Sequence, residues 1–270
     1  MPYNTIAMQT NNAQQMGLGI LQRIAVREKA KMQALFLSRL YESPDSAQIA
    51  LCGSMGLHGV YLHGRWSKDL DFEMLLEAAP RFQEIADGCG LTLGKPEDPV
   101  EFVNTLQYTF ARPSAVYPEV AIAVEVFCKE RIALPPERRL FAAVSGETVA
   151  VFVQPLAFML ATKVGCVFRR DKALDFFDLW LGLRSEPTTA YQVRDLLAQG
   201  LCEAGDFTPP VILDVDLALD KFRNIRAAWV DDLSAYMTAV PNFEQVYCDL
   251  SRWLSFLAEK PNKRKEQSNG

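Results

Sequence analysis

The sequence predicts an α+β fold, in which a mixed sheet with flanking helices is followed by a helical second half. Short apolar strands alternate with helical segments up to residue 153, and from Pro155 onward almost every segment has helical apolar spacing. The composition, 49% hydrophobic and 23% charged over 270 residues, is ordinary for a globular protein with a real core. We therefore expect an α+β core over 1–153, a helical domain over 154–260 and a flexible polar tail over 261–270.

Apolar periodicity and chain breakers place the elements of the first half. A helix is expected over 20–45, where the Ser-Pro-Asp-Ser run at 43–46 ends it. Further helices are expected over 55–62 and 80–87, the second closed by Gly88 and Gly90. Strands are expected over 48–52, 68–75, 102–110, 120–127 and 148–153.

The second half is expected to be helical throughout. Pro155 can begin a helix, because the N–H that proline lacks would have no partner in the first turn. The expected helices cover 155–169, 172–184, 189–203, 215–235 and 242–258.

Charge and hydropathy restrict the classes of function. The net charge of −5 gives no general support for nucleic-acid binding, although basic residues gather at 163–172 and at 260–265. The second cluster has the form of a solvated tail. No apolar run is long enough to cross a bilayer, and the polar N-terminus has no signal pattern, so we expect a cytoplasmic protein without membrane contact.

Six cysteines stand singly along the chain, with no Cys-x-x-Cys pair and only two histidines. This spacing does not fit a zinc site or a disulfide framework, and we expect buried free thiols.

The most informative feature is an acidic pair, Asp69 and Asp71. Residues two apart in a strand project from the same face, so the sequence predicts two carboxylates side by side, with Leu70 and Phe72 pointing into the core. Neighbouring carboxylates repel each other unless a cation lies between them, and oxygen ligands of this kind suit Mg²⁺. We interpret the pair as metal ligands; a solvated edge strand with two chance acids is the alternative.

Gly53 and Ser54 follow an apolar strand and precede a segment of helical length. Glycine lets the backbone approach a phosphate closely, and the following N–H groups and the Ser54 hydroxyl can bind its oxygens. The pattern predicts a phosphate-binding turn.

Glu125 is a candidate for a third carboxylate, because it is the only charge within an otherwise apolar strand. A buried carboxylate needs a partner such as a metal, and Ala121 and Ala123 on the same face would leave room for a nucleotide. An exposed edge-strand glutamate is the alternative.

In the helical half, Lys163 lies among apolar residues of its helix, so its ammonium either reaches solvent or meets a negative group such as a triphosphate. Asp175 and Asp178 are three apart and share one helical surface. Asp171 fits a helix N-cap as well as it fits a catalytic role.

A strand, a Gly-Ser turn, a helix and then Asp-x-Asp resembles the nucleotidyltransferase superfamily that includes DNA polymerase β. More closely, residues 65–72 (Arg-Trp-Ser-Lys-Asp-Leu-Asp-Phe), Lys163, Arg170 and the Asp-Phe-Phe-Asp-Leu run at 175–179 resemble the AbiEii/AbiGii family of bacterial nucleotidyltransferase toxins. The resemblance extends over about residues 25–258. It departs at Cys52, where the family has a second glycine, and at Leu174, where it often has arginine.

This resemblance implies a polymerase-β-like core and a toxin that transfers a nucleotidyl group from an NTP, with Mg²⁺, to RNA such as tRNA, alongside a cognate antitoxin. It implies metal ligation by Asp69, Asp71 and Glu125, and nucleotide binding by six residues: Gly53, Ser54, Lys163, Arg170, Asp175 and Asp178. Two alternatives remain open: transfer to a small molecule, as in aminoglycoside nucleotidyltransferases, and an inactive protein that acts by binding a partner. Neither His58 nor His63 is assigned a role.

Overall fold

A computed structural model describes residues 20–75, 82–93, 105–113, 120–130, 134–186, 188–200 and 213–259. The expected tail over 261–270, the basic cluster at 260–265 and Cys202 lie outside these residues. The chain divides into two compact units, which we describe in turn. The first comprises Met1–Met159 with Val230–Val240, and the second Leu160–Trp229 with Pro241–Gly270.

The first unit is built on a mixed seven-stranded sheet in the order β3-β4-β5-β2-β1-β7-β6. The strands are β1 (Ile49–Cys52), β2 (Leu70–Leu75), β3 (Thr92–Leu93), β4 (Thr105–Arg112), β5 (Val120–Lys129), β6 (Glu137–Ala142) and β7 (Thr148–Val153). The pairs β2–β5 and β1–β7 are parallel, and the other pairs are antiparallel.

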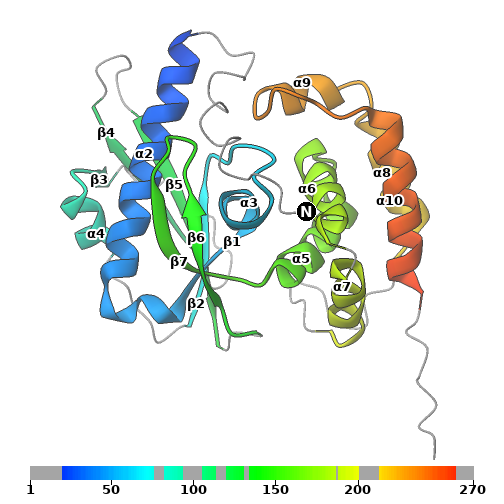
Figure 1. The fold of residues 1–270 in the computed structure, drawn as a ribbon, viewed down its shortest axis with the longest axis horizontal. Helices are drawn as coiled ribbons and strands as arrows, with labels where there is room; N and C mark the ends of the chain where they lie inside the picture. The colour runs from blue at the N-terminus through cyan, green and yellow to red at the C-terminus, as the bar shows by residue number, and fades with distance from the viewer. Residues whose placement is uncertain are drawn as a thin grey trace, which may run out of the picture. The chain divides into compact units, whose positions relative to one another are not determined.

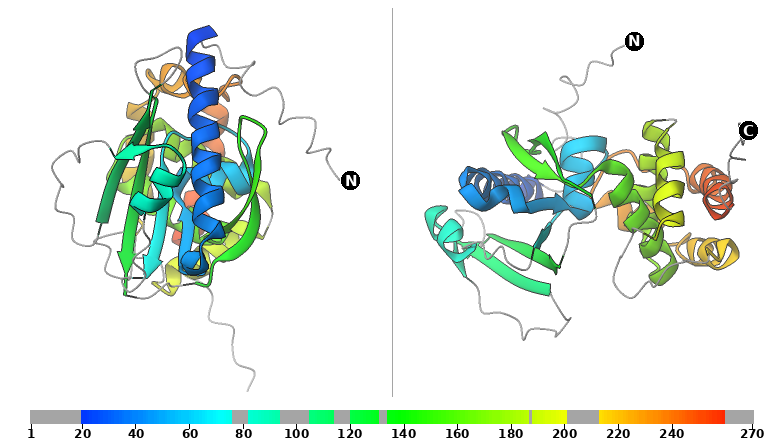
Figure 2. Two further views of the ribbon diagram at one scale, coloured as in Figure 1. Left: turned by 90° about the vertical axis from the view of Figure 1, so that its left-hand side faces the viewer. Right: turned by 90° about the horizontal axis from the view of Figure 1, so that it is seen from below.

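One face of this sheet carries the main core of the unit. The long helix α2 (Ile20–Glu42) runs along the sheet and packs on β5 and β7, and the short α4 (Phe82–Gly88) packs beside it (Figures 1 and 2). Four buried rings, Phe36, Phe72, Phe82 and Phe110, fill the layer between these helices and the sheet. Burying a phenylalanine contributes roughly 1.5–3 kcal/mol, so this layer anchors the sheet.

The chain turns sharply at the end of β1. The 3-10 helix η1 (Pro44–Gln48) leads into β1, and the short helix α3 (Gly53–Gly56) starts directly after it and continues as a π-helical stretch, η2 (Leu57–Leu62). His63 ends this stretch in the left-handed conformation, with φ 50°.

The second unit is helical (Figure 1). Its helices are α5 (Leu156–Arg169), α6 (Ala173–Ser185), α7 (Thr189–Ala198), α8 (Val215–Asn224) and α10 (Phe243–Ala258), while α9 (Trp229–Ser234) starts at its boundary. Helix α10 packs against α6, α7 and α8 around Phe222, whose ring contacts Phe176, Trp229, Phe243 and Tyr247.

The structure confirms the predicted fold class and corrects several elements. The strand β6 and the short β3 were not expected, and the single helix expected over 215–235 is two helices, α8 and α9. Helix α7 ends at Ala198, earlier than the expected 203.

Of the described cysteines, Cys52, Cys89 and Cys128 are buried free thiols, but Cys248 is exposed, so the expectation of burial is wrong there. It lies on the solvent side of α10, where the Arg252 guanidinium is its hydrogen-bond donor. None of the helices in the described ranges has the length and apolar character of a membrane span.

Candidate active site

A row of polar side chains crosses the middle of the sheet in the first unit. Four neighbouring strands place Cys52, Asp71, Glu125 and Gln107 in direct register, in the order β1, β2, β5, β4. Register partners project from the same face, and strands lie about 4.8 Å apart. We call this set the acidic row. It brings together two of the predicted carboxylates, Asp71 and Glu125, on adjacent strands.

The pattern of burial confirms which side chains share this face. Leu70 and Phe72 are fully buried on the opposite face, as predicted, whereas Asp71 between them is only partly buried. In β5 the same alternation leaves Glu125 partly exposed, and the Gln107 amide donates a hydrogen bond of 3.2 Å to its Oε1.

Asp69 is not part of the strand, which corrects the prediction that both aspartates lie on it. The strand pairing of β2 with β5 begins at Leu70, and Asp69 lies in an exposed bend just before it. The backbone upstream is hydrogen-bonded elsewhere: the Gln33 side chain donates to the Lys68 carbonyl at 2.7 Å. This hydrogen bond ties the residue before Asp69 to α2.

A lysine of α2 lies close to Asp69. Burial lowers the pKa of the Lys29 ammonium, and the Asp69 carboxylate acts in the opposite direction. Sequence reasoning did not single out Lys29.

Gly53 begins the turn, and two independent constraints require glycine there. Its φ is +59°, a left-handed conformation that costs other residues roughly 1–2 kcal/mol. In addition, a Cβ at this position would lie 2.0 Å from Oδ2 of Asp71. The turn is therefore in direct contact with the acidic row, and no larger residue fits without moving the Asp71 carboxylate.

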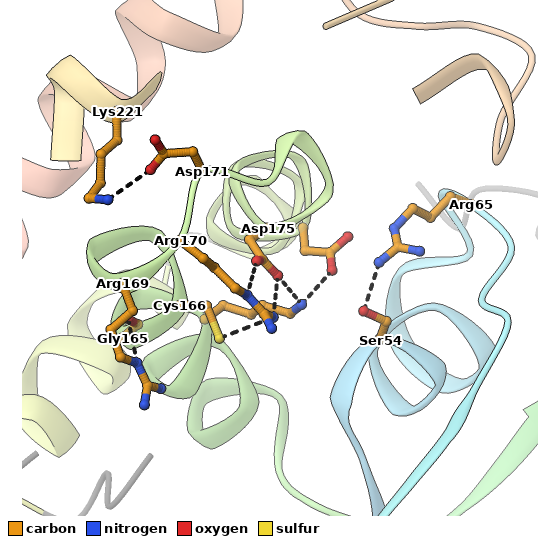
Figure 3. A network of polar contacts seen from close by, with 11 residues as sticks. Ser54, Arg65, Gly165, Cys166, Arg169, Arg170, Asp171, Asp175 and Lys221 are labelled. Atoms are coloured by element: carbon orange, nitrogen blue, oxygen red, sulfur yellow. Dashed lines mark hydrogen bonds and ion pairs between the residues drawn. The ribbon is translucent and has the colours of Figure 1, made fainter. Parts of the chain in front are cut away.

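Ser54 is held by an arginine that the sequence did not mark as a site residue. The buried Arg65 guanidinium donates to Ser54 Oγ at 2.7 Å (Figure 3). It also donates to the Trp66 carbonyl at 3.0 Å. A fixed cation beside the serine hydroxyl makes this turn more favourable for an anion. The only sequence signal was the position of Arg65 four residues before Asp69.

A further carboxylate, Glu73, lies two residues along β2 from Asp71, on the same face. Burial raises its pKa, while Lys129 and a 2.8 Å hydrogen bond from Gln154 Nε2 act in the opposite direction. The other side-chain atom of Gln154, Oε1, is buried and has no hydrogen-bond partner. Alternation of acids at 69, 71 and 73 was the signal that could have found Glu73.

These oxygen donors fit Mg²⁺ in chemical type, although the described ranges contain no group of three or more His, Cys, Asp or Glu side chains placed so that together they could hold a metal ion. Mg²⁺ needs only one or two protein carboxylates and takes its remaining ligands from water and substrate phosphates. Asp71 and Glu125 in register, with Asp69 at the strand entrance, provide such an open arrangement.

In the helical unit, a second group of predicted residues forms a buried charge network. The Lys163 ammonium lies between two carboxylates, 2.7 Å from Asp175 and 2.9 Å from Asp178. Arg170 donates to Asp175 through Nε at 2.6 Å and through Nη2 at 3.0 Å. Two cations thus face two anions, and we call these four residues the Lys163 network.

The cations of the network favour the ionised form of Asp175. Burial by itself would raise the pKa of Asp175, but the Lys163 ammonium and the Arg170 guanidinium outweigh it and hold this pKa below the usual value. Arg170 supplies a guanidinium to Asp175, although the residue directly before Asp175 is Leu174 and not the arginine that the family resemblance implies. Asp175 therefore keeps an arginine partner despite the departure noted in the sequence.

Packing of α5 on α6 brings Lys163 to its partners. A Cβ at Gly182 would lie 2.2 Å from a Leu160 methyl carbon, so only glycine allows the two helices to approach this closely. The N-cap residue of α6 is Lys172, which corrects the expectation of Asp171 as a cap; Asp171 instead pairs with Lys221 at 2.7 Å. The pairing holds the Asp171 carboxylate toward α8.

Comparisons with known proteins agree with this architecture. The family profile "Nucleotidyl transferase AbiEii toxin, Type IV TA system" matches residues 35–249. No curated protein sequence matches the chain.

Two solved structures share the fold. The nucleotidyltransferase toxin MenT4 from Mycobacterium tuberculosis H37Rv is similar with a TM-score of 0.59 and 16% identity, covering 95% of this chain and 90% of its own. JHP933 from Helicobacter pylori has a TM-score of 0.52 and 16% identity, covering 86% of this chain and 91% of its own. Since the family profile spans most of the sequence, the chain belongs to the AbiEii family of nucleotidyltransferase toxins.

Proposed function

We propose that this nucleotidyltransferase uses Mg²⁺ and an NTP to modify RNA, such as tRNA, in the cytoplasm, as the toxin of a pair with an antitoxin protein. The observation that carries the proposal is the direct contact between the Gly53 turn and Asp71 of the acidic row. A phosphate-binding turn and a pair of metal-binding acids are the two parts that nucleotidyl transfer requires, and here each determines the position of the other.

In the proposed reaction, a hydroxyl oxygen of the acceptor attacks the α-phosphorus of the NTP. A new oxygen–phosphorus bond forms, the bond from the α-phosphorus to the bridging oxygen breaks, and pyrophosphate leaves while the acceptor hydroxyl loses its proton. Bound Mg²⁺ would supply charge neutralisation on the phosphates and activation of the attacking oxygen.

Residues of the first unit have distinct proposed roles. Asp71 and Glu125 would hold the metal, joined by Asp69 from the strand entrance, and the Gly53–Ser54 turn offers backbone N–H groups and a hydroxyl to the phosphates. Arg65 keeps the Ser54 hydroxyl in place through its 2.7 Å hydrogen bond.

The Lys163 network is the proposed nucleotide-binding contribution of the helical unit. The Lys163 side chain is 8% exposed and held by two aspartates, so its role is to fix Asp175 and Asp178 as much as to meet phosphate. Arg170 is the member of the network that is accessible to a nucleotide, because its side chain is 45% exposed.

Transfer to a small molecule is the second candidate, favoured by the net charge of −5, which does not attract an RNA backbone. One experiment separates the two candidates. The purified protein is incubated with Mg²⁺ and each α-³²P-labelled NTP, with total RNA in one arm and a metabolite extract in the other. Label on RNA, lost in EDTA and in Asp71→Asn, supports the proposal. Label only on small metabolites supports the second candidate, and label on neither contradicts both.

A further inference from the structure

Asp69 lies just before β2, outside the hydrogen-bonded ladder of the sheet. Strand pairing starts at Leu70, and the segment 64–69 precedes it as bends and irregular chain. The position of the Asp69 carboxylate therefore depends on whatever holds this segment from outside.

Gln33 of α2 provides one such contact from within the core. Its side chain is 1% exposed, and its Nε2 donates to the carbonyl of Lys68 at 2.7 Å, with the Ser67 carbonyl at 3.5 Å. Lys68 immediately precedes Asp69, so this hydrogen bond fixes the peptide that leads into the carboxylate residue. Helix α2 is itself packed on β5, β7 and α4, which makes it a firm support.

Tyr236 holds the same segment from another direction. Its carbonyl accepts a 3.1 Å hydrogen bond from the Trp66 backbone N–H, and its ring stacks on Trp66 at 6.2 Å. The Lys68 ammonium lies 5.0 Å from the centre of the Tyr236 ring. Tyr236 thus restrains positions 66 and 68, whereas Gln33 binds the carbonyl that adjoins Asp69.

We propose that Gln33 is a positioning residue that orients Asp69 for metal binding, an inference that rests on the proposed function. A buried side-chain amide is costly in an apolar layer unless its N–H groups are hydrogen-bonded. The Lys68 carbonyl is the acceptor that pairs the Gln33 amide. Without this donor the Lys68 carbonyl turns to water, and Asp69 loses its fixed direction. Loss of a group that orients a metal ligand typically weakens metal affinity about 10- to 100-fold.

The test uses Mn²⁺ as the probe, titrated by electron paramagnetic resonance into the full-length protein with a non-hydrolysable NTP analogue. Gln33→Met keeps the size of the side chain and removes the donor, and we expect it to weaken Mn²⁺ binding about 10- to 100-fold. Lys31→Met, an exposed position of the same helix, is the matched substitution and should leave the affinity unchanged. Leu37→Ala, a buried position one turn on, controls for general loss of stability.

A double-variant cycle distinguishes positioning from a general structural role. If Gln33 acts through Asp69, then Gln33→Met has no further effect on Mn²⁺ affinity once Asp69→Asn is present. Equal affinities of Gln33→Met and wild type, losses that add up in the double variant, or an equal loss in Leu37→Ala would each overturn the assignment. A wild type that fails to bind Mn²⁺ contradicts the proposed metal dependence itself, and the assignment falls with it.

Discussion

The acidic row and the Lys163 network use similar residues in opposite ways. In the row, Asp71 and Glu125 stand beside each other in register, and Asp69 lies at the strand entrance near Lys29. In the network, two aspartates are matched by Lys163 and Arg170 at hydrogen-bond distances of 2.6–3.0 Å. The first group sets carboxylates side by side, an arrangement that a metal cation would stabilise further, whereas the second pairs each carboxylate with a cation.

This difference indicates which region serves activity and which serves the stability of the fold. Like charges held together on a rigid sheet lower stability and are retained where a ligand supplies the missing charge. A balanced buried network contributes to the fold, because removal of one member leaves its partners buried and unpaired. We therefore expect changes in the row to affect activity chiefly, and changes in the network to affect unfolding chiefly.

The largest effect on stability is expected from Lys163→Met. The change leaves Asp175 and Asp178 buried beside Arg170 with one cation too few, at a cost of about 3–5 kcal/mol. Urea unfolding followed by circular dichroism measures it, with the exposed Lys172→Met as the matched control, expected within about 0.5 kcal/mol of wild type. A loss below 1 kcal/mol for Lys163→Met would show that the network is not a structural unit.

The next effect is on activity, from Asp71→Asn. Since removal of a group that merely orients a metal ligand costs about 10- to 100-fold, removal of a proposed ligand should reduce nucleotidyl transfer by more than about 100-fold. The free energy of unfolding should change by only about 1 kcal/mol or less, because asparagine keeps the size of a side chain that is only partly buried. Asp87→Asn, on the exposed side of α4, is the control for loss of one carboxylate. A marked loss of stability in Asp71→Asn would contradict the comparison.

Gly53→Ala should cost about 1–3 kcal/mol of stability and reduce activity, since it strains the backbone and displaces the Asp71 carboxylate. The backbone strain does not depend on Asp71, but the clash with its carboxylate does. The combined Gly53→Ala and Asp71→Ala variant should therefore lose less stability than the sum of the losses in the two single variants. Unfolding of all four members of this cycle measures the coupling. Strict additivity would show that the predicted clash does not occur.

The smallest effects are on the pH dependence of stability, and they should differ in sign between Glu73, next to the acidic row on β2, and Asp175 of the Lys163 network. Burial raises the pKa of Glu73 above that of the unfolded chain, so the folded state loses stability as pH rises from about 4.3 through the folded pKa. The pKa of Asp175 is held down by its cations, so its contribution is full above about 3.9 and is lost as pH falls.

Urea unfolding at several pH values checks both directions. The stability gain of Glu73→Gln over wild type should grow between pH 4 and 7 and vanish at lower pH, and Asp175→Asn should remove part of the stability loss of wild type below about pH 4. A Glu73→Gln variant whose difference from wild type does not change with pH would contradict the assigned shift.

Sequence patterns predicted much of this fold for identifiable reasons. Apolar runs marked β1, β2, β5 and β7, which are central in the sheet. Strand β6 was missed because it lies at an edge, where Arg138, Arg139 and Leu140 are exposed and the apolar pattern is lost. The break between α8 and α9 was missed because helical spacing continues through residues 225–228.

The candidate site was predictable only where its members are close in sequence. The spacing of Asp175 and Asp178 implied that they are neighbours, but Lys163 meets them from another helix, across the contact between Gly182 of α6 and Leu160 of α5. Likewise, nothing in the local pattern connects Gln33 to Lys68, 35 positions apart. Contacts of this kind depend on packing between elements, which periodicity does not encode.

The most direct test of the central claim is nucleotidyl transfer to RNA measured as a function of Mg²⁺ concentration for wild type, Asp71→Asn, Glu125→Gln and the exposed control Lys31→Met. The account predicts saturable Mg²⁺ dependence in wild type and Lys31→Met, and transfer reduced more than about 100-fold in the two acidic-row variants, which still unfold with nearly wild-type stability. Transfer that proceeds in EDTA, or that survives in Asp71→Asn, would contradict it.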